Sequence, residues 1–331
     1  MKHQFLYLLF IFCFVTVATL LAQTDNKLRT ENSLNDMLPG GGTAEDPYLI
    51  SDYQSLKKVK NNLSAYYLVT MDIDASASKS ENGGMGFEPI GSCNVPFKGH
   101  FKGNGHYIKN LYVNRSDADN VGLFRCLSGA TIDALGLIYC TIIGHDSIGS
   151  ICGSNINSSS INNCYFSGTV SGNSYVGGCV GINRAIISCC YATGRVFGNR
   201  HILGGLAGFN GSKGSINNCY AIVSVNGYYE AGGLVGFSDL SKITNCYTAG
   251  KVSGNDTGGL VGYDFWSTIT NSYDNFETSC QIDRVVAGES KSTIELKKQS
   301  TFTDWDFKMI WVMSSGNSYP GLRSINNAPF A

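Results

Sequence analysis

The chain has 331 residues, a formal net charge of −1 at pH 7, and only 15% charged residues. This balance excludes the strongly basic surface with which proteins bind nucleic acids or anionic membranes. Hydrophobic residues make up 43% of the chain and 40 residues are glycine, so a sizeable core can form and tight turns must be frequent.

The first residues have the pattern of a secretory signal peptide. Lys2 precedes an apolar stretch from Phe5 to Leu21, and Ala22 stands at the expected cleavage point. We therefore expect residues 1–22 to be removed. An uncleaved anchor is the alternative, because Leu20 is larger than the residue usually found three positions before the cut. No later apolar stretch is long enough to span a bilayer, so membrane insertion of the mature chain is not expected.

The region after the predicted signal peptide leads into the repeats. Residues 23–39 are expected to be flexible, and residues 40–119 to form an N-terminal cap and the first coils. Within them, residues 51–62 have a weak pattern of a short amphipathic helix. The segments 67–73 and 97–113 are expected to supply early coils, with Gly99, Gly103 and Gly105 at turns.

Residues 120–275 repeat one pattern six times. Paired glycines are followed by a short apolar run, an isoleucine and, four residues later, usually a tyrosine. The second glycine or its equivalent recurs every 26 to 28 residues, at Gly122, Ser150, Gly178, Gly205, Gly233 and Gly259. The isoleucines are Ile132, Ile161, Ile187, Ile216, Ile243 and Ile269, and the tyrosines are Tyr165, Tyr191, Tyr220, Tyr247 and Tyr273. Each unit offers three short extended pieces, and none buries its apolar side alone.

Such units are expected to stack as coils of an all-β parallel β-helix. Each strand then bonds to its equivalents above and below at about 4.8 Å. The isoleucines fill the core, and the paired glycines permit either a turn or a close backbone approach that a Cβ would obstruct. Tyrosine ladders could contact sugars or could equally pack at a corner.

An asparagine ladder precedes the tyrosines. Its members are Asn163, Asn218, Asn245 and Asn271, whose amides can bond along the stack. A bend at this asparagine would turn the next residue inward, whereas strict alternation would turn it outward. That next residue is often cysteine, and exposed free thiols are a liability in a secreted protein. We therefore expect the bend.

The sequence has 12 cysteines. Cys13 lies in the predicted signal peptide, which leaves an odd number, and several others recur at the repeat period. A secreted chain favours disulfides, but this arrangement forms no obvious paired framework. We expect most of the cysteines to be buried thiols that act as small hydrophobic residues.

Residues 276–331 are expected to form a C-terminal cap. An open β-helix exposes unpaired strand edges at both ends, so its terminal segments should differ from the repeats. Trp305, Phe307, Ile310 and Trp311 are expected to fold across the last coil as a hydrophobic cap. An aromatic sugar platform is the alternative for these residues.

The repeated segments resemble a known family. "GGLVG" at 232–236 and 258–262, "GGLAG" at 204–208 and "GGCVG" at 177–181 precede sequences such as "ITNCYTAGKV" and "INNCYFSGTV". They are similar to the GLUG repeat of bacterial surface proteins, which include adhesin-like chains and segments that flank immunoglobulin A1 metallopeptidase domains. The resemblance covers residues 120–275 and implies a right-handed parallel β-helix with cell-surface or secreted use. The predicted signal peptide leaves a periplasmic location open as well. The metallopeptidase zinc motif is missing from this sequence, so that activity is not implied.

Few residues suggest chemistry. Asp72 and Asp74 could share one strand face for calcium binding or acid–base work, although a solvated face is the simpler interpretation. His100 and His106 flank a glycine-rich turn and Cys93 lies nearby, but no metal-binding spacing appears. We therefore predict no catalytic, cofactor-binding or metal-binding residue.

The sequence leaves three functions open. The leading one is a non-catalytic, monomeric, adhesin-like module that binds a glycan or a host or microbial surface protein through its ladder face. A polysaccharide lyase or hydrolase that uses Asp72, Asp74 or the loops between Gly83 and His106 is the second. A purely structural envelope protein is the third.

Overall fold

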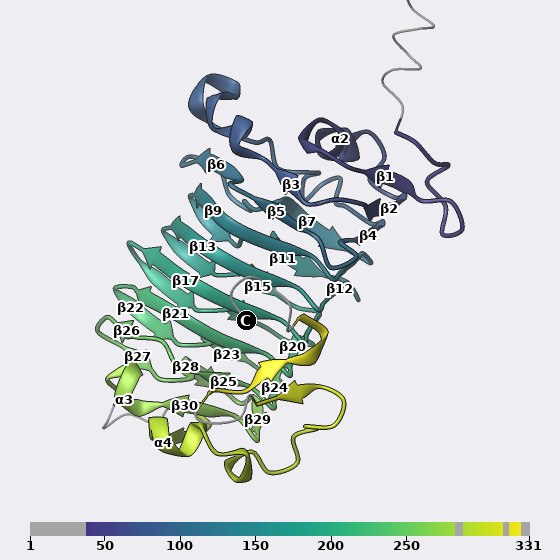
Figure 1. The fold of residues 1–331 in the computed structure, drawn as a ribbon. Coiled ribbons are helices and arrows are strands. Elements are labelled where there is room, and N and C mark those ends of the chain that lie inside the picture. Colours follow the sequence, from purple (N-terminus) through teal and green to yellow (C-terminus); the bar gives the residue numbers. More distant parts are fainter. Residues whose placement is uncertain (1–37, 282–286, 314–317, 326–331) are drawn as a thin grey trace, which may run out of the picture. The chain divides into compact units, whose positions relative to one another are not determined.

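The computed structural model describes residues 38–281, 287–313 and 318–325. The predicted signal peptide, and all but Leu38 and Pro39 of the expected flexible segment, lie outside these residues. The chain divides into Met1–Pro39 and Gly40–Ala331. The second unit is a solenoid of stacked parallel strands (Figure 1), which confirms the predicted all-β parallel architecture.

Four parallel sheets run along the stack. Sheet A contains β1 (Tyr48–Ile50), β2 (Tyr66–Val69), β4 (His100–Lys102), β8 (Thr131–Asp133), β12 (Ser160–Asn162), β16 (Ile186–Ser188), β20 (Ser215–Asn217), β24 (Lys242–Thr244) and β29 (Thr268–Thr270). Sheet B contains β3 (Ile73–Asp74), β5 (Tyr107–Lys109), β6 (Tyr112–Arg115), β9 (Gly136–Gly144), β13 (Tyr165–Gly172), β17 (Tyr191–Gly198), β21 (Tyr220–Asn226), β25 (Tyr247–Thr248), β26 (Val252–Ser253), β30 (Tyr273–Asn275) and β31 (Glu289–Lys291).

Two shorter sheets complete the coils of the repeat region. Sheet C contains β7 (Phe124–Ser128), β11 (Cys152–Ile156), β15 (Val180–Asn183), β19 (Ala207–Asn210), β23 (Val235–Asp239) and β28 (Val261–Phe265). Sheet D contains β10 (Asp146–Ile148), β14 (Ser174–Gly177), β18 (His201–Gly204), β22 (Tyr229–Gly232) and β27 (Thr257–Gly258). A full repeat therefore has four strands where the sequence predicts three, because the residues that lead into the paired glycines are also extended.

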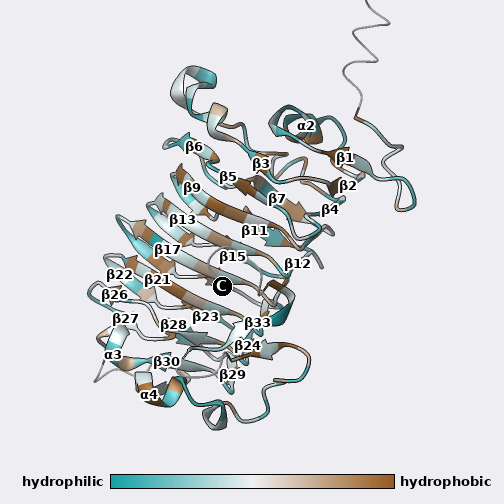
Figure 2. Ribbon diagram, in the orientation of Figure 1, coloured by the Kyte–Doolittle hydropathy of each residue, from teal (hydrophilic) through white to brown (hydrophobic). Residues whose placement is uncertain are grey.

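The predicted isoleucine ladder forms the core. Equivalent isoleucines pair in register from β8 to β29, and those from Ile132 to Ile243 are fully buried. Figure 2 shows hydrophobic positions that recur from strand to strand along the stack. Stacking of identical apolar side chains thus supplies the interior that a single repeat lacks.

The glycines of the repeated "GGLVG" segments serve close backbone approach. None of them has a φ in the left-handed region, but the chain bends at Gly205 and Leu206 and at the equivalent pairs between sheets D and C, so a turn and a close approach occur together. A Cβ on Gly208 would lie 2.5 Å from the carbonyl carbon of Tyr175 and 2.7 Å from the backbone nitrogen of Val176. Sheets C and D therefore meet backbone to backbone at these positions, where only glycine fits.

The asparagine before the tyrosine lies at a bend, as predicted. Asn163, Asn218, Asn245 and Asn271 have φ between 47° and 53°, a left-handed conformation that asparagine tolerates. The residues that follow the bend include Cys164, Cys190, Cys219 and Cys246, all with 0% exposure. Amide bonding along this ladder is weak, since Asn245 Nδ2 donates to Asn218 Oδ1 at 3.5 Å.

Most described cysteines are unpaired thiols. Seven of them are buried: Cys140, Cys152, Cys164, Cys179, Cys190, Cys219 and Cys246. Burial raises the pKa of Cys140 to about 12, which keeps this thiol protonated and inert. The prediction is wrong for Cys93 and Cys126, which form a disulfide with a Cα–Cα distance of 5.1 Å. Neither belongs to the repeated cysteine position, so the period gave no sign of their contact.

Short helices cover the first coils. The helix predicted within residues 51–62 is present as α2 (Tyr53–Lys58) followed by η1 (Val59–Asn61). Asp52 caps α2 by accepting a hydrogen bond from the Ser55 backbone nitrogen at 2.7 Å, which satisfies a free N–H of the first turn. Two further short helices, η2 (Ser76–Ser80) and η3 (Asn82–Gly84), follow β3.

The C-terminal segment packs on the outside of sheet B. It contains α3 (Phe276–Ser279), α4 (Thr293–Leu296), η4 (Gln299–Thr301), the antiparallel pair β32 (Trp311–Val312) and β33 (Gly321–Leu322), and η5 (Arg323–Ile325). The tyrosine ladder stacks with ring-centroid distances of 4.8 to 5.3 Å between Tyr165, Tyr191, Tyr220 and Tyr247. The ring centroids of Trp305 and Tyr273 are 6.1 Å apart, and those of Trp311 and Tyr220 are 6.3 Å apart. The segment thus extends back over earlier coils instead of covering the last coil alone.

A buried carboxyl group at the end of sheet B should make stability depend on pH. Asp274 is 2% exposed; Ser290 donates to its Oδ1 at 2.8 Å, while Oδ2 lacks a hydrogen-bond partner within the described chain. Burial therefore raises the pKa of Asp274. A carboxyl group whose pKa is higher in the folded than in the unfolded chain lowers the stability of the folded state as the pH rises. The fall begins near the unfolded-state pKa and ends above the folded-state pKa. We expect Asp274→Asn to raise Tm at neutral pH by a few degrees.

Thermal unfolding between about pH 4 and pH 8 measures this effect. The variant should lack the fall in Tm that the parent shows over the lower part of this range. Asp117→Asn, which changes an exposed residue, is the control and should keep the parental slope. An equal slope in the parent and in Asp274→Asn would contradict the prediction.

Candidate binding groove

The outer face of sheet A carries two parallel rows of solvent-accessible side chains. One row consists of Tyr66, His100, Thr131, Ser160, Ile186, Ser215, Lys242 and Thr268. The other consists of Leu68, Lys102, Asp133, Asn162, Ser188, Asn217, Thr244 and Thr270. Because side chains alternate along a strand, the residues between the rows face the core. Hydroxyl, amide and charged groups therefore dominate this face.

A groove with a volume of about 280 Å³ lies at the start of this face, over β2, β4 and β8. Its walls include Tyr66, His100, Lys102 and Asp133, and Ala44 and Pro47 line it as well. The rings of Tyr66 and His100 stack with centroids 4.2 Å apart and planes 6° apart. Parallel pairing of β2 and β4 places the two rings on neighbouring strands in register, which produces the stack.

Polar groups surround the stacked rings. Asp133 Oδ1 accepts a hydrogen bond from Asn163 Nδ2 at 2.9 Å, which orients the carboxylate. Lys102 is exposed and lies beside His100 on the same strand face, so the groove combines flat rings, a cation and a carboxylate. Ligand sites commonly pair an apolar surface with a few polar groups that fix orientation. This groove is therefore suited to a ligand with hydroxyl groups around an apolar ring face.

The two predicted candidate aspartates are engaged in local contacts. Asp72 Oδ1 lies 3.0 Å from His106 Nδ1 and accepts from the Tyr107 backbone nitrogen at 3.3 Å. Asp74 Oδ1 accepts from the Ser76 backbone nitrogen at 3.0 Å and from Asn110 Nδ2 at 3.2 Å. These hydrogen bonds lower the pKa of Asp74 to about 2, so it stays ionised and is a poor proton donor.

The structure separates the histidines and the cysteine that the sequence places near one glycine-rich turn. His100 lies in the groove, His106 pairs with Asp72, and Cys93 is bonded to Cys126. Their side chains therefore form no shared metal site. The groove was not predicted, because β2 and β4 lie outside the clear repeats and only β8 belongs to one. The alternating outward residues of 66–68 and 100–102 were the only available signal.

A cluster of one histidine and two aspartates, which the sequence did not predict, lies beside sheet D. Ligand atoms of Asp119, His145 and Asp146 lie within 4.8 Å of one another, and His145 Nδ1 is 2.9 Å from Asp119 Oδ1. Asp119 Oδ1 also accepts from the Asp146 backbone nitrogen, and Asp146 Oδ1 accepts from the Ser174 backbone nitrogen. These bonds join successive coils, which gives the cluster a structural role.

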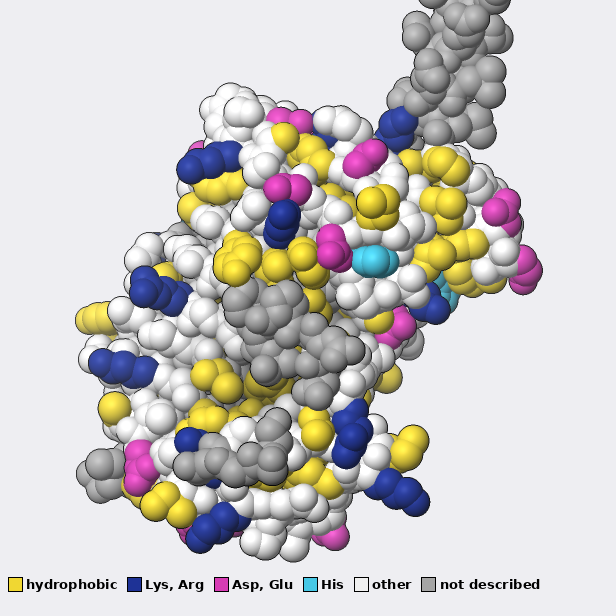
Figure 3. Space-filling view, in the orientation of Figure 1, with side chains coloured by type: hydrophobic (Ala, Val, Ile, Leu, Met, Phe, Trp, Pro, Cys, Tyr) yellow, Lys and Arg dark blue, Asp and Glu magenta, His cyan; other side chains and the backbone are white. Residues whose placement is uncertain are grey.

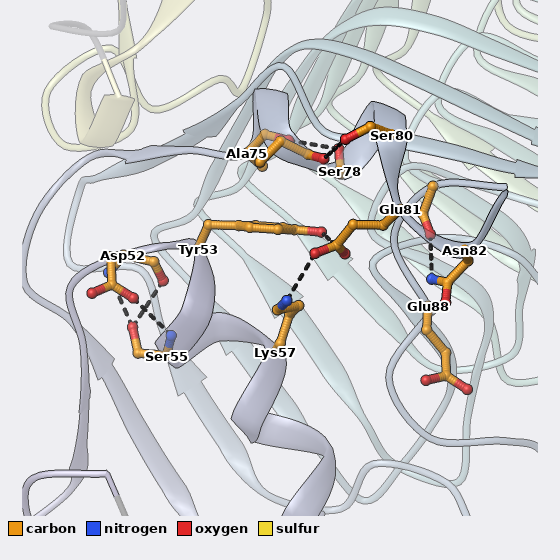
Figure 4. A network of polar contacts seen from close by, with 12 residues as sticks. Asp52, Tyr53, Ser55, Lys57, Ala75, Ser78, Ser80, Glu81, Asn82 and Glu88 are labelled. Carbon is orange, nitrogen blue, oxygen red and sulfur yellow. Dashed lines mark hydrogen bonds and ion pairs between the residues drawn. The ribbon is translucent and has the colours of Figure 1, made fainter. Parts of the chain in front are cut away.

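The loop region between Gly83 and His106 contributes His100 to the groove and Cys93 to the disulfide. Figure 4 shows the nearby network in which Glu81 accepts from Tyr53 Oη at 2.7 Å and from Lys57 Nζ at 2.8 Å. Burial, together with Glu81, raises the pKa of Tyr53, so its hydroxyl remains a hydrogen-bond donor. The network ties α2 to the end of η2. On the face in Figure 3, charged side chains are scattered and form no single cluster.

Comparisons with known proteins agree with the repeat pattern. Residues 199–226 match the Glug family, described as the GLUG motif, so the chain contains this motif. Halomucin of Haloquadratum walsbyi is 40% identical over 149 residues, which are 43% of this chain and 2% of halomucin. A candidate Gly-rich membrane protein of Evansella cellulosilytica is 36% identical over 122 residues, which are 35% of this chain and 14% of that protein. The similarity therefore spans a small share of either relative.

A solved structure shares the fold. The crystal structure of a candidate immunoglobulin A1 protease from Bacteroides ovatus superimposes with a TM-score of 0.63 and 21% identity, over 86% of this chain and 94% of that one. At this identity the likeness concerns the fold alone. Within the described part of this chain, no helix is long and apolar enough to cross a membrane.

Proposed function

Starting from a GLUG-containing parallel β-solenoid, we propose that the protein is a non-catalytic binding module, secreted or displayed at the cell surface, that recognises a glycan. The observation that carries this proposal is the groove over β2, β4 and β8. It presents the stacked rings of Tyr66 and His100 beside Lys102 and Asp133. A sugar offers an apolar ring face to the aromatic groups and hydroxyl groups to the charged ones.

Binding is favoured over cleavage by the state of the carboxylates. Hydrolysis of a glycosidic bond generally needs two carboxyl groups, one of them with a raised pKa. Asp74 has a lowered pKa and Asp72 is paired with His106. The buried tyrosine ladder is not the binding surface, because Tyr165, Tyr191, Tyr220, Tyr247 and Tyr273 are at most 4% exposed.

The proposed location at the cell surface is supported by the sequence and by a relative. The apolar N-terminal stretch predicts export, and one relative is named as a membrane protein. Antibody labelling of intact cells, compared with permeabilised cells, tests this part. Strong labelling of intact cells is expected. Labelling only after permeabilisation would instead favour a periplasmic location and a structural envelope role.

Loss of the ring stack should weaken glycan binding. We expect Tyr66→Ala and His100→Ala each to reduce the affinity for the best ligand on a glycan array by about tenfold, which corresponds to about 1.4 kcal/mol. Calorimetric titration with that glycan provides the measurement, and the glycan should be recovered without cleavage.

Tyr228→Ala is the matched control, since Tyr228 is a 55% exposed aromatic residue that lies outside the groove and away from sheet A. Its affinity should equal that of the parent. Parental affinity in Tyr66→Ala would remove the groove from the proposal. Recovery of shortened glycan would replace binding by a cleavage reaction.

A further inference from the structure

A second group of exposed aromatic side chains lies at the opposite end of sheet A from the groove. Tyr263 and Phe265 on β28 are each 44% exposed, and Trp266, which follows them, is 80% exposed. Leu240, one coil earlier, is 56% exposed. We name these four residues the terminal aromatic surface. β28 and β29 lie at the end of the solenoid furthest from β1 (Figure 1).

The terminal aromatic surface continues an aromatic ladder along sheet C. Phe209, Phe237 and Tyr263 pair in register, with centroids 5.4 and 5.1 Å apart in edge-to-face geometry. Phe209 is only 8% exposed, so exposure increases toward the last coil. The rings of Phe265 and Trp266 are 6.3 Å apart. Rigid rings thus collect where the stack ends.

The backbone does not explain why Leu240 and Trp266 are apolar. Both lie two residues before a strand of sheet A, with φ of 47° and 57°, where earlier coils use Gly129, Ser158 and Lys213 with φ of 62° to 72°. A bulky residue in this left-handed conformation is unusual, whereas glycine or asparagine adopts it readily. Neither local conformation nor burial therefore favours a tryptophan at position 266.

The surroundings indicate what such residues contact. Trp266 leads directly into β29, so the terminal aromatic surface adjoins Lys242, Thr268 and Thr270 on the outer rows of sheet A. The same two rows begin in the groove. Six strand-to-strand steps separate β4 from β29, or about 29 Å at the spacing of neighbouring strands. A polar face therefore has aromatic rings at both of its ends.

We propose that the terminal aromatic surface is a second saccharide-binding site, and that a polysaccharide chain long enough to reach both sites binds the groove and Trp266 together. The inference takes its ligand class from the proposed function. Two sites on one rigid scaffold make the second contact intramolecular, so affinity should rise steeply once the chain spans them. An isolated protein-docking patch would give no such dependence on chain length.

Tryptophan fluorescence can report on this site selectively. The chain has three tryptophans, and Trp305 and Trp311 are 6% and 0% exposed whereas Trp266 is 80% exposed. We would titrate the full chain with cellotriose, xylotriose, maltotriose and chitotriose, which are too short to reach both sites, and with the corresponding soluble polysaccharides. The expected result is a blue shift of the emission with at least one of these glycan types. Its polysaccharide should bind about tenfold or more tightly than its trisaccharide.

Trp266→Asn separates binding from folding. It should abolish the blue shift and the extra affinity for the polysaccharide, and its Tm should equal or exceed the parental value because asparagine tolerates the left-handed backbone. Leu240→Asn should weaken polysaccharide binding in the same direction. Tyr228→Ala, which changes a 55% exposed aromatic residue away from sheet A, is the control and should behave like the parent.

Several outcomes would overturn this second site. No blue shift with any of the saccharides, or full polysaccharide affinity in Trp266→Asn, would do so and would leave the groove untouched. A blue shift that follows protein concentration alone would identify a second copy as the occupant. A blue shift with phosphatidylcholine–phosphatidylglycerol vesicles but with no saccharide would identify a lipid surface. If Tyr66→Ala alone lost binding, the proposed function would stand without this site.

Discussion

Gly208→Ala is expected to lower the free energy of unfolding by about 3 kcal/mol, near the upper end of what overpacking usually costs. The added methyl would lie 2.5 Å from the Tyr175 carbonyl carbon, 2.7 Å from the Val176 nitrogen and 2.8 Å from the Gly181 oxygen. All three are backbone atoms held in paired strands or at their ends, so no side chain can rotate away. Relief requires that sheets C and D separate over neighbouring coils, which breaks contacts in a closely packed interior.

Urea unfolding, followed by far-ultraviolet circular dichroism, measures this loss as a shift in the midpoint at constant slope. Gly227→Ala is the control. Its new methyl would first meet the Leu203 side chain at 3.1 Å, and its φ is not in the left-handed region. It should cost about 1 kcal/mol or less. Equal losses in the two variants would show that the close approach of sheets C and D is not what selects glycine.

The repeat period carries most of the information about the fold. A ladder of identical residues has a direct physical consequence, because equivalent positions in successive coils must share one environment. Isoleucine at one position and asparagine before cysteine at another therefore predicted the core and the bend, and both are confirmed by Ile187 and Asn218. The strands of sheet D were not predicted, because segments such as Ser174–Gly177 end in glycine, which lowers their apparent strand propensity.

Contacts outside the period could not be predicted in this way. The Cys93–Cys126 disulfide joins a loop to β7, and no repeated spacing connects the two residues. The C-terminal segment covers the tyrosine ladder through Trp311 and Leu322, and sequence alone gives no register for that docking. The groove depends on three early strands whose outward residues, such as Tyr66 and His100, differ from coil to coil. The proposed binding site therefore lies where the outward residues depart from the repeat.

A buried asparagine ladder also recurs at the repeat period. Asn155, Asn183 and Asn210 are separated by 28 and 27 residues and are all 0% exposed. Asn155 Nδ2 donates to Asn183 Oδ1 at 2.8 Å, and Asn183 Nδ2 donates to Asn210 Oδ1 at 2.8 Å. The spacing of 27 and 28 residues could have identified these asparagines from the sequence. Their burial could not be predicted, because it depends on the corner between sheets C and A.

Asn183→Asp tests how much this buried amide ladder contributes. The substitution keeps the shape of the side chain but removes the amide hydrogens that Asn183 donates to Asn210 and, at 3.2 Å, to the Ala185 carbonyl. Above the ordinary pKa of aspartate the variant must either bury a charge next to the Asn210 oxygen or keep a proton that the unfolded chain has released. We expect a loss of about 3–5 kcal/mol at pH 7, as when a buried charge lacks a partner. Asn183→Ala should lose about 2 kcal/mol, since it leaves the neighbouring amides partly unsatisfied.

The pH dependence distinguishes the two causes. Because burial disfavours the ionised form, the folded-state pKa of the introduced carboxyl lies above its unfolded value. Its destabilisation should therefore grow as the pH rises from about 4 and shrink again in acid, whereas the loss in Asn183→Ala should not change with pH. Asn217→Asp, on the accessible face of sheet A, is the control and should change stability by about 0.5 kcal/mol or less. Urea unfolding midpoints at several pH values measure these differences. If the loss of stability in Asn183→Asp did not depend on pH, water would have access to the site and the asparagine ladder would not be buried in solution.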